Sequence, residues 1–196
     1  ARERLADRVI SGQLESYGLP ATYKIASVGP TRQVLTDVVI GDPARPDLTV
    51  ERAEIELVAT LGVPTVGKVV LIRPRLYGSY KAGHFSLGSI DKLLSGGGGG
   101  GIPDLNLVLD DGRARIATDY GALGIKAAGN GNLRNGFAGI LAAVAPALET
   151  GSCKAERTTL FGTIRTSAGE PRFAGPLRIA SLTCAGPGLV VRDAGM

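Results

Sequence analysis

Residues 48–59 read Leu-Thr-Val-Glu-Arg-Ala-Glu-Ile-Glu-Leu-Val-Ala, the cleanest alternation of apolar and polar side chains in the sequence. In an extended strand Ala53, Ile55 and Leu57 fall on one face, and the glutamates between them fall on the other. A strand with one apolar and one charged face is typical of a sheet that buries only one side. The stretch therefore predicts a β fold.

Other strands are predicted on both sides of this stretch, because the period of two recurs along most of the chain. Val69 and Leu71 share one face of the next predicted strand, and Leu105, Leu107 and Leu109 alternate with polar residues in the second half. Further strands are expected at 23–27, 34–40, 113–118, 122–131, 133–143, 158–166, 177–184 and 189–192.

Turn residues separate these strands. Asp111-Gly112 and Asn135-Gly136 are hairpin signals, and Ala168-Gly169-Glu170-Pro171 also turns the chain. In the strand 158–166, Leu160 and Ile164 share one face. Successive strands joined by short hairpins predict an antiparallel meander.

Two short helices interrupt the β pattern. Residues 2–17 place apolar side chains at three- to five-residue steps, which predicts an amphipathic helix. Residues 89–94 predict a short helix with Ser89 as its N-cap.

Gly96 to Gly101 is a run of six glycines without the Lys and Ser/Thr of a phosphate-binding loop, so a flexible linker is expected there. With the N-terminal helix and this linker, the chain is expected to have four segments. These are an N-terminal helix at 1–18, a first sheet segment at 19–95, the linker at 96–101 and a second sheet segment at 102–196.

The composition excludes several classes of protein. Hydrophobic residues make up 44% of the chain and aromatic residues 5%, so a core would consist of Val, Ile, Leu and Ala. The formal charge of +4 is compatible with anionic lipid surfaces, but without a Lys/Arg run or an aromatic stacking set no nucleic-acid partner is expected. The sequence contains no run of about 18 apolar residues, so no membrane-spanning helix is predicted within it.

The sequence contains two cysteines, Cys153 and Cys184. A disulfide between them would indicate an oxidising compartment, and two buried thiols in the cytosol are the alternative. With His84 as the single histidine and no Cys-x-x-C or Gly-x-Ser-x-Gly motif, no metal site, cofactor or catalytic residue is expected.

Residues 69–94 read Val-Val-Leu-Ile-Arg-Pro-Arg-Leu-Tyr-Gly-Ser-Tyr-Lys-Ala-Gly-His-Phe-Ser-Leu-Gly-Ser-Ile-Asp-Lys-Leu-Leu. This stretch resembles the AsmA-like superfamily of the TamB/YdbH type, in which a strand with a Pro-x-Leu element precedes a Ser-Leu-Gly-x-(Ile/Leu)-Asp-x-Leu-Leu helix. The run 32–55 is similar to the first strands of that family. Asp-Tyr-Gly-Ala-Leu-Gly-Ile at 119–125 resembles its YdbH-like branch.

This resemblance implies a periplasmic protein held at the inner membrane by an anchor upstream of Ala1. It implies a mainly β fold, an antiparallel meander that forms a curved, groove-like (taco-shaped) sheet, with the N-terminal amphipathic helix and one short internal helix. The apolar concave face would carry phospholipid or other acyl-chain lipid between the two membranes, with a partner protein at the outer membrane. The family has no catalytic motif.

The residues support an acyl-lipid function independently, because the two predicted helices are too small to cover every apolar strand face. Either a second sheet layer covers the rest, as in a β-sandwich or closed barrel, or part stays open to acyl chains. An acyl chain gains about 0.8 kcal/mol per buried CH₂. The lipid-facing candidates are Ala53, Ile55, Leu57, Val69, Leu71, Leu105, Leu107, Leu109, Leu160 and Ile164.

Arg73 and Arg75 are candidates for contact with lipid head groups, and cross-strand ion pairing is the alternative for both. For the whole chain, the alternative function is a scaffold module that assists outer-membrane protein assembly through its sheet edges. A hydrolase would be a third reading, for which the sequence offers no nucleophile motif.

Overall fold

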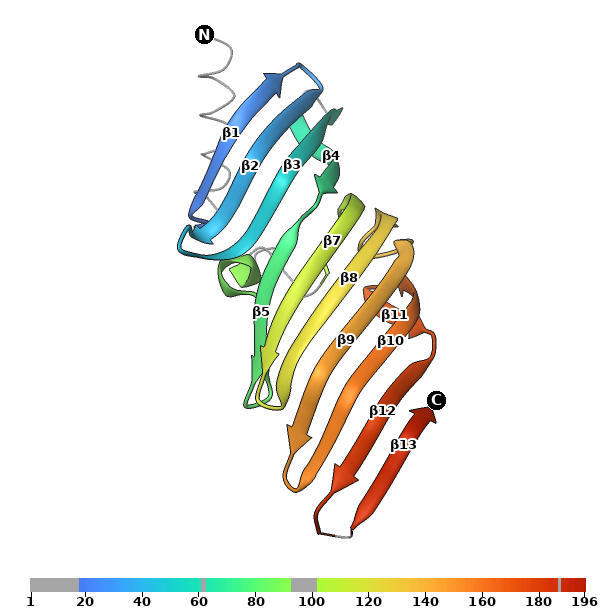
Figure 1. The fold of residues 1–196 in the computed structure, drawn as a ribbon. Coiled ribbons are helices and arrows are strands. Elements are labelled where there is room, and N and C mark those ends of the chain that lie inside the picture. Colours follow the sequence, from blue (N-terminus) through green and yellow to red (C-terminus); the bar gives the residue numbers. More distant parts are fainter. Residues whose placement is uncertain (1–17, 61–62, 93–101, 187) are drawn as a thin grey trace.

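One large sheet makes up nearly all of the molecule (Figure 1). The computed structural model describes residues 18–60, 63–92, 102–186 and 188–196. In this part of the chain thirteen strands join in the main order β1-β2-β3-β4-β7-β8-β9-β10-β12-β13. The strands are β1 (Ala21–Val28), β2 (Arg32–Asp42), β3 (Arg45–Thr60), β4 (Val63–Ile72), β5 (Arg75–Lys81), β6 (His84–Ser86), β7 (Asn106–Thr118), β8 (Gly121–Asn132), β9 (Ala138–Thr150), β10 (Cys153–Ser167), β11 (Glu170–Ala174), β12 (Leu177–Cys184) and β13 (Leu189–Gly195).

The predicted mainly β fold is confirmed, and most neighbouring strands are antiparallel as expected. The turn at Asn135-Gly136 is confirmed between β8 and β9. Ala168-Gly169 also turns the chain as expected, but it leads into the short strand β11, which was not predicted, before the expected strand at 177–184. Gly169 has φ +80° and Ala168 has φ +54°, so both adopt the left-handed backbone that such a turn requires.

The meander is wrong at one place, where β7 runs parallel to both β4 and β5. Residues 68–72 of β4 pair with the first half of β7, and residues 75–80 of β5 pair with its second half. A parallel pair needs a long crossover, and here residues 82–105 separate β5 from the first residue of β7, Asn106, which pairs with Lys68 of β4. Strands from both sides of the predicted linker therefore join in one sheet, and the division into domains stays a prediction.

The predicted hairpin at Asp111-Gly112 is also wrong, because β7 continues through these residues as a bulge. Leu109 pairs with Gly129 of β8, whereas Gly112 pairs with Ala127, so three residues on β7 span two on β8. Asp111 lies at this bulge and has φ +47°, a left-handed backbone conformation that accommodates the extra residue. The apolar side chains of β7 therefore change from odd to even positions at this bulge.

The helices differ from the expectation as well. The predicted helix 2–17 lies outside the described residues. The short internal helix begins as a 3₁₀ turn, η1 (Gly88–Ile90), and continues as α-helix at Asp91 and Lys92, so helix is confirmed at 89–92. Its N-cap position is Leu87, so the prediction of Ser89 as N-cap is wrong. Residues 93 and 94 of that prediction, and the glycine run 96–101, lie outside the described residues.

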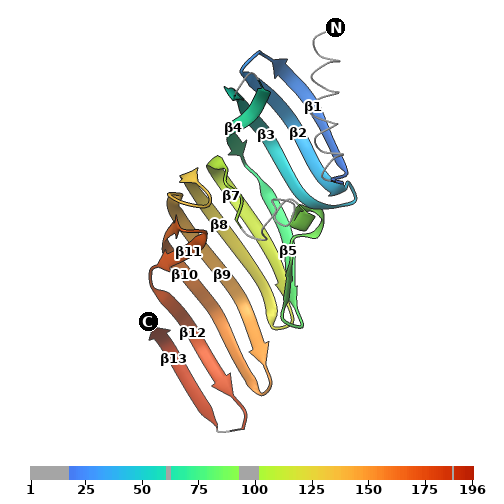
Figure 2. The same ribbon diagram turned by 180° about the vertical axis from the view of Figure 1, so that it is seen from behind.

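The sheet is open, since β1 and β13 are its two edges and do not pair with each other. In both views the strands follow one another along the length of a single layer (Figures 1 and 2). The alternative of a closed barrel or a two-layer sandwich is therefore wrong for the described residues. No helix among them is long and apolar enough to cross a membrane.

Candidate functional site

Apolar side chains from strands far apart in the sequence line up on one face of the sheet, called here the apolar face. Ala53, Leu71 and Leu109 lie directly opposite one another on β3, β4 and β7. The next set on the same face is Ile55, Val69 and Leu107, again in register. Six of the ten lipid-facing candidates are thus neighbours on one face.

The other four candidates are placed as follows. Ile164 on β10 joins the line of Leu109 through Gly139 and Gly129. Leu160 on β10 lies on the same face, four residues from Ile164. Leu57 follows Ile55 by two residues on β3, and Leu105 precedes the first residue of β7.

A longer line crosses seven strands without a polar side chain, and sequence reasoning missed most of it. We call it the central row; each member pairs directly with the next, and the members are Leu48, Leu76, Ala114, Ile125, Ala143, Leu160 and Leu177. Six inter-strand spacings of about 4.8 Å make it roughly 29 Å long. The alternation in β7 and β8 could have revealed it, but the bulge at Asp111 reverses the phase.

The N-terminal end of the apolar face is covered. A buried cluster closes over β2, β3 and β7, and it consists of Leu19, Leu35, Val38, Ile40, Val50, Ala53, Leu87, Ile90 and Ile116. Leu87 and Ile90 come from the η1 segment, which crosses the sheet on this face. Leu87 lies against Gly78, where a Cβ would be 2.7 Å from its Cδ2.

Asp47 on β3 holds the η1 segment against the sheet through hydrogen bonds. The backbone N and Oγ of Ser89 both donate to Oδ2 of Asp47, at 2.9 and 2.6 Å. Gly88 next to it has φ +64° and leaves no room for a Cβ beside the Asp47 carboxylate. On the other side of η1, Asp91 accepts hydrogen bonds from Ser86 Oγ and Leu87 N, at 2.6 and 2.8 Å. Ala53 is therefore inside a closed core, 6% exposed.

The cluster ends near β8 among the described residues. Ala143, Leu160 and Leu177 are half-buried and are not among the residues that pack against it, whereas the half-buried Ala114 and Ile125 pack against its edge. In a single-layer sheet such side chains keep part of their surface in contact with solvent. The apolar face is thus closed over β2, β3 and β7 and open from β8 to β12.

Two glycines, Gly129 and Gly139, lie in the line between Leu109 and Ile164, where β8 and β9 come close together. A Cβ on Gly129 would lie 2.6 Å from Ala138 O and 2.9 Å from Phe137 Cζ, so the strands β8 and β9 approach too closely for alanine. Gly124 on the same strand has room, since its Cβ would lie 3.5 Å from Val144 Cγ1.

Gly129→Ala is therefore expected to lower the free energy of unfolding by about 1–3 kcal/mol, as overpacking does. Gly124→Ala, the matched control, is expected to leave stability unchanged or to raise it by about 0.5 kcal/mol. Urea unfolding of both variants measures the difference. Equal stabilities would contradict the close approach of the two strands.

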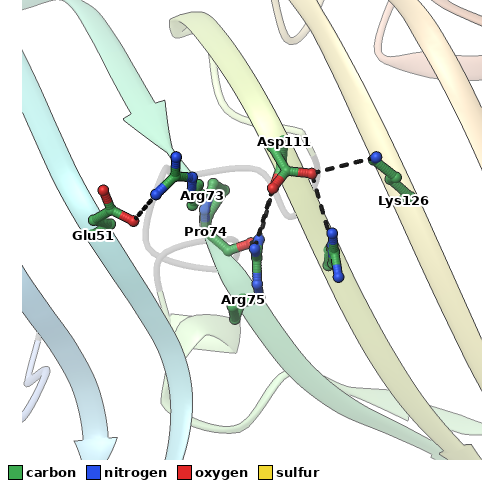
Figure 3. Close-up of polar contacts among 7 residues, drawn as sticks. Glu51, Arg73, Pro74, Arg75, Asp111 and Lys126 are labelled. Carbon is green, nitrogen blue, oxygen red and sulfur yellow. Dashed lines mark hydrogen bonds and ion pairs between the residues drawn. The ribbon is translucent and has the colours of Figure 1, made fainter.

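Charged side chains gather on the opposite face, near the bulge in β7 (Figure 3). Asp111 accepts a hydrogen bond from Arg75 Nη2 at 3.2 Å, and Arg75 Nη1 donates to Asp111 O at 2.7 Å. Lys126 Nζ and Arg113 Nε lie 3.6 and 3.7 Å from the other carboxylate oxygen. Burial alone would raise the pKa of Asp111, but Arg75, Arg113 and Lys126 outweigh it and lower this pKa.

Arg73 and Arg75 are both paired within the chain. Arg73 Nη1 donates to Glu51 Oε2 at 2.6 Å, and Arg75 is held by Asp111 (Figure 3). This is the cross-strand pairing expected as the alternative. Contact of either arginine with a lipid head group stays a prediction.

Cys153 and Cys184 form the predicted disulfide, which joins β10 to β12. The bond lies at the far end of β12, next to the turn that leads into β13.

Residues 1–194 match the model of the YdbH-like family, described as "Intermembrane phospholipid transport protein YdbH". The family is one of lipid transport proteins rather than enzymes. No curated protein and no solved structure matches the chain. The resemblance inferred from residues 69–94 is confirmed by the family match.

Proposed function

We propose a function from one premise, which is that the chain belongs to the YdbH-like family of intermembrane phospholipid transport proteins. The apolar face is proposed to hold phospholipid acyl chains during their passage between the inner and outer membrane. The chain would form one segment of a curved β-groove along which the lipid moves.

The observation that carries this proposal is the central row. Its open part runs from Ile125 to Leu177 and presents only aliphatic side chains, which suit an acyl chain and place no polar group in its path. The hydrocarbon core of a bilayer is about 30 Å thick, so one leaflet's chains reach about 15 Å. The row is long enough for such a chain to lie across several strands.

The η1 segment gives this path a boundary. Leu87 and Ile90 fill the apolar face over β2 and β3, so acyl chains are proposed to lie beyond Ile116, over β8 to β12. The candidates Leu160 and Ile164 would then contact lipid. Ala53 would instead serve the core that closes the path.

The location is part of the proposal. The family description fits the space between two membranes, and a disulfide between Cys153 and Cys184 suits an oxidising compartment such as the periplasm. Anchoring at the inner membrane and a partner at the outer membrane complete the proposed arrangement.

Lipid analysis of the purified protein tests the proposal. After purification without detergent, extraction and mass spectrometry are expected to show phospholipid bound to the chain, and added fluorescent phospholipid is expected to exchange with it. A chain that carries no phospholipid and takes up none from vesicles contradicts the proposal.

A scaffold for outer-membrane protein assembly is the second candidate, favoured by the exposed edge strand β13. Leu189 and Val190 on this strand are 47% and 56% exposed, and β12 is the one strand among the described residues with which β13 pairs. Such an edge can add a strand from a partner. A proline that blocks the outer edge of β13 would abolish partner capture by a scaffold and leave lipid binding to the apolar face intact.

A further inference from the structure

A shallow hollow of about 720 Å³ crosses five neighbouring strands, β5, β7, β8, β9 and β10. Each strand contributes three consecutive residues to its lining. The middle residue of each triplet belongs to the central row, and the two outer residues point to the opposite face. The outer residues form two parallel lines, Arg75, Arg113, Lys126, Ala142 and Phe161 in one, and Tyr77, Arg115, Gly124, Val144 and Thr159 in the other.

The lining places the hollow on the opposite face. A hollow on the apolar face would be lined by the next side chains on that face, such as Ile116, Leu123 and Leu141, and none of these lines it. The two lines of outer residues are its walls, and the backbone of the central row is its floor. We call this feature the trench.

The two ends of the trench differ in charge. Arg75, Arg113, Arg115 and Lys126 line the end over β5, β7 and β8, and no acidic side chain is among the described lining residues. Asp111 beside them contacts three of these cations. Four positive charges against one carboxylate leave a surplus of three, and Arg115 has no charged partner in the described part of the chain.

The end over β9 and β10 is apolar and exposed. Phe161 is 60% exposed and Val144 is 45% exposed, because the side chain of Ala142 beside them is too small to cover them. Exposed large apolar side chains next to one another are uncommon on a surface that binds nothing. Gly124 and Ala142 are wall positions with no side chain or a small one, so no side chain from them fills the trench.

We propose that the trench binds a single-chain anionic amphiphile, such as a lysophospholipid with a phosphate head group. Its anionic head lies among Arg113, Arg115 and Lys126, and its acyl chain runs toward Val144 and Phe161. Wall residues two apart on a strand have Cα atoms about 6.8 Å apart, so the trench is too narrow for two acyl chains side by side. The site is on the other side of the sheet from the apolar face and does not depend on the proposed function.

Calorimetric titration of the full chain with lysophosphatidylglycerol below its micelle concentration tests the site. The titrations use the Leu160→Glu background, so that the apolar face does not contribute. Phe161→Ala and Arg115→Ala are each expected to weaken binding about tenfold. Ile140→Ala and Arg165→Ala alter the same face outside the trench and are expected to change nothing.

The choice of probe separates an amphiphile site from simpler ones. Lysophosphatidylcholine, which has no net charge, is expected to bind about tenfold more weakly than lysophosphatidylglycerol. Inorganic phosphate is expected not to displace the bound lipid at equal concentration. Equal binding of both lysolipids, full displacement by phosphate, or equal effects of the trench and control variants would each overturn the proposal.

Discussion

Leu160→Glu is expected to reduce the phospholipid bound to the purified protein by about tenfold or more. Leu160 lies in the open part of the central row, between Ala143 and Leu177, and does not belong to the buried cluster. A carboxylate there must lose its hydration when an acyl chain covers it, and an unpaired charge in such surroundings costs several kcal/mol. In the folded protein without lipid the desolvation cost of this carboxylate is much smaller, since the side chain keeps contact with solvent.

Thr163→Glu is the matched control for this variant. Thr163 is on the same strand, is exposed, points to the opposite face and does not line the trench. Both variants are expected to show the strand content of the parent by circular dichroism. Lipid extraction followed by mass spectrometry compares them, and equal lipid content in the two variants would contradict an acyl-chain role for the central row.

Replacing both Cys153 and Cys184 by serine is expected to lower the free energy of unfolding by about 3–4 kcal/mol. The disulfide closes a loop with a sequence separation of 31 residues, and that loop length sets the entropy which the cross-link removes from the unfolded chain. Chemical unfolding of the double variant, compared with the oxidised parent, measures the loss.

The loss is expected to concentrate at the C-terminal end of the sheet. In the described part of the chain β13 pairs with β12 alone, and the disulfide fixes β12 to β10 next to the turn into β13. Hydrogen exchange should therefore increase most in β12 and β13 and least in β2 and β3, under the η1 cover. Uniform acceleration over the whole sheet would contradict this local role.

Strand existence was predictable from sequence wherever one face is wet. In β3 the alternation of Ala53, Ile55 and Leu57 with glutamates reports a face in contact with solvent, and the structure has that strand. The candidates within β4 and within β7 share a face because residues two apart do so where a strand has no bulge. The strand register then places them on the same face as Ala53 and Ile55.

The bulge at Asp111 could not be predicted from its own residues. Asp-Gly favours a left-handed backbone in a hairpin turn and in a bulge alike. What decides between them is the neighbouring strands: β8 pairs with residues on both sides of this point, β4 pairs with β7 before it, and β5 pairs with β7 after it. That information lies 30 or more residues upstream and about 15 residues downstream.

The crossover was missed for a related reason. A run of glycines is a local sign of a linker, but it does not say where the chain goes next. Parallel pairing of β4 and β7 joins residues such as Val69 and Leu107 across that run. Likewise, the hydroxyl of Ser89 binds Asp47, a residue 42 positions away, and no capping rule contains such a contact.

The most direct test of acyl chains on the apolar face is a photo-crosslinking scan along β10 and β12 in cells. A benzophenone side chain is placed in turn at Leu160, Ile164 and Ile179 on the apolar face, and at Thr163, Arg165 and Arg178 on the opposite face. After irradiation, phospholipid adducts are expected at the first three positions and not at the last three. Adducts of equal yield on both faces, or none at Leu160, Ile164 and Ile179, would contradict the account.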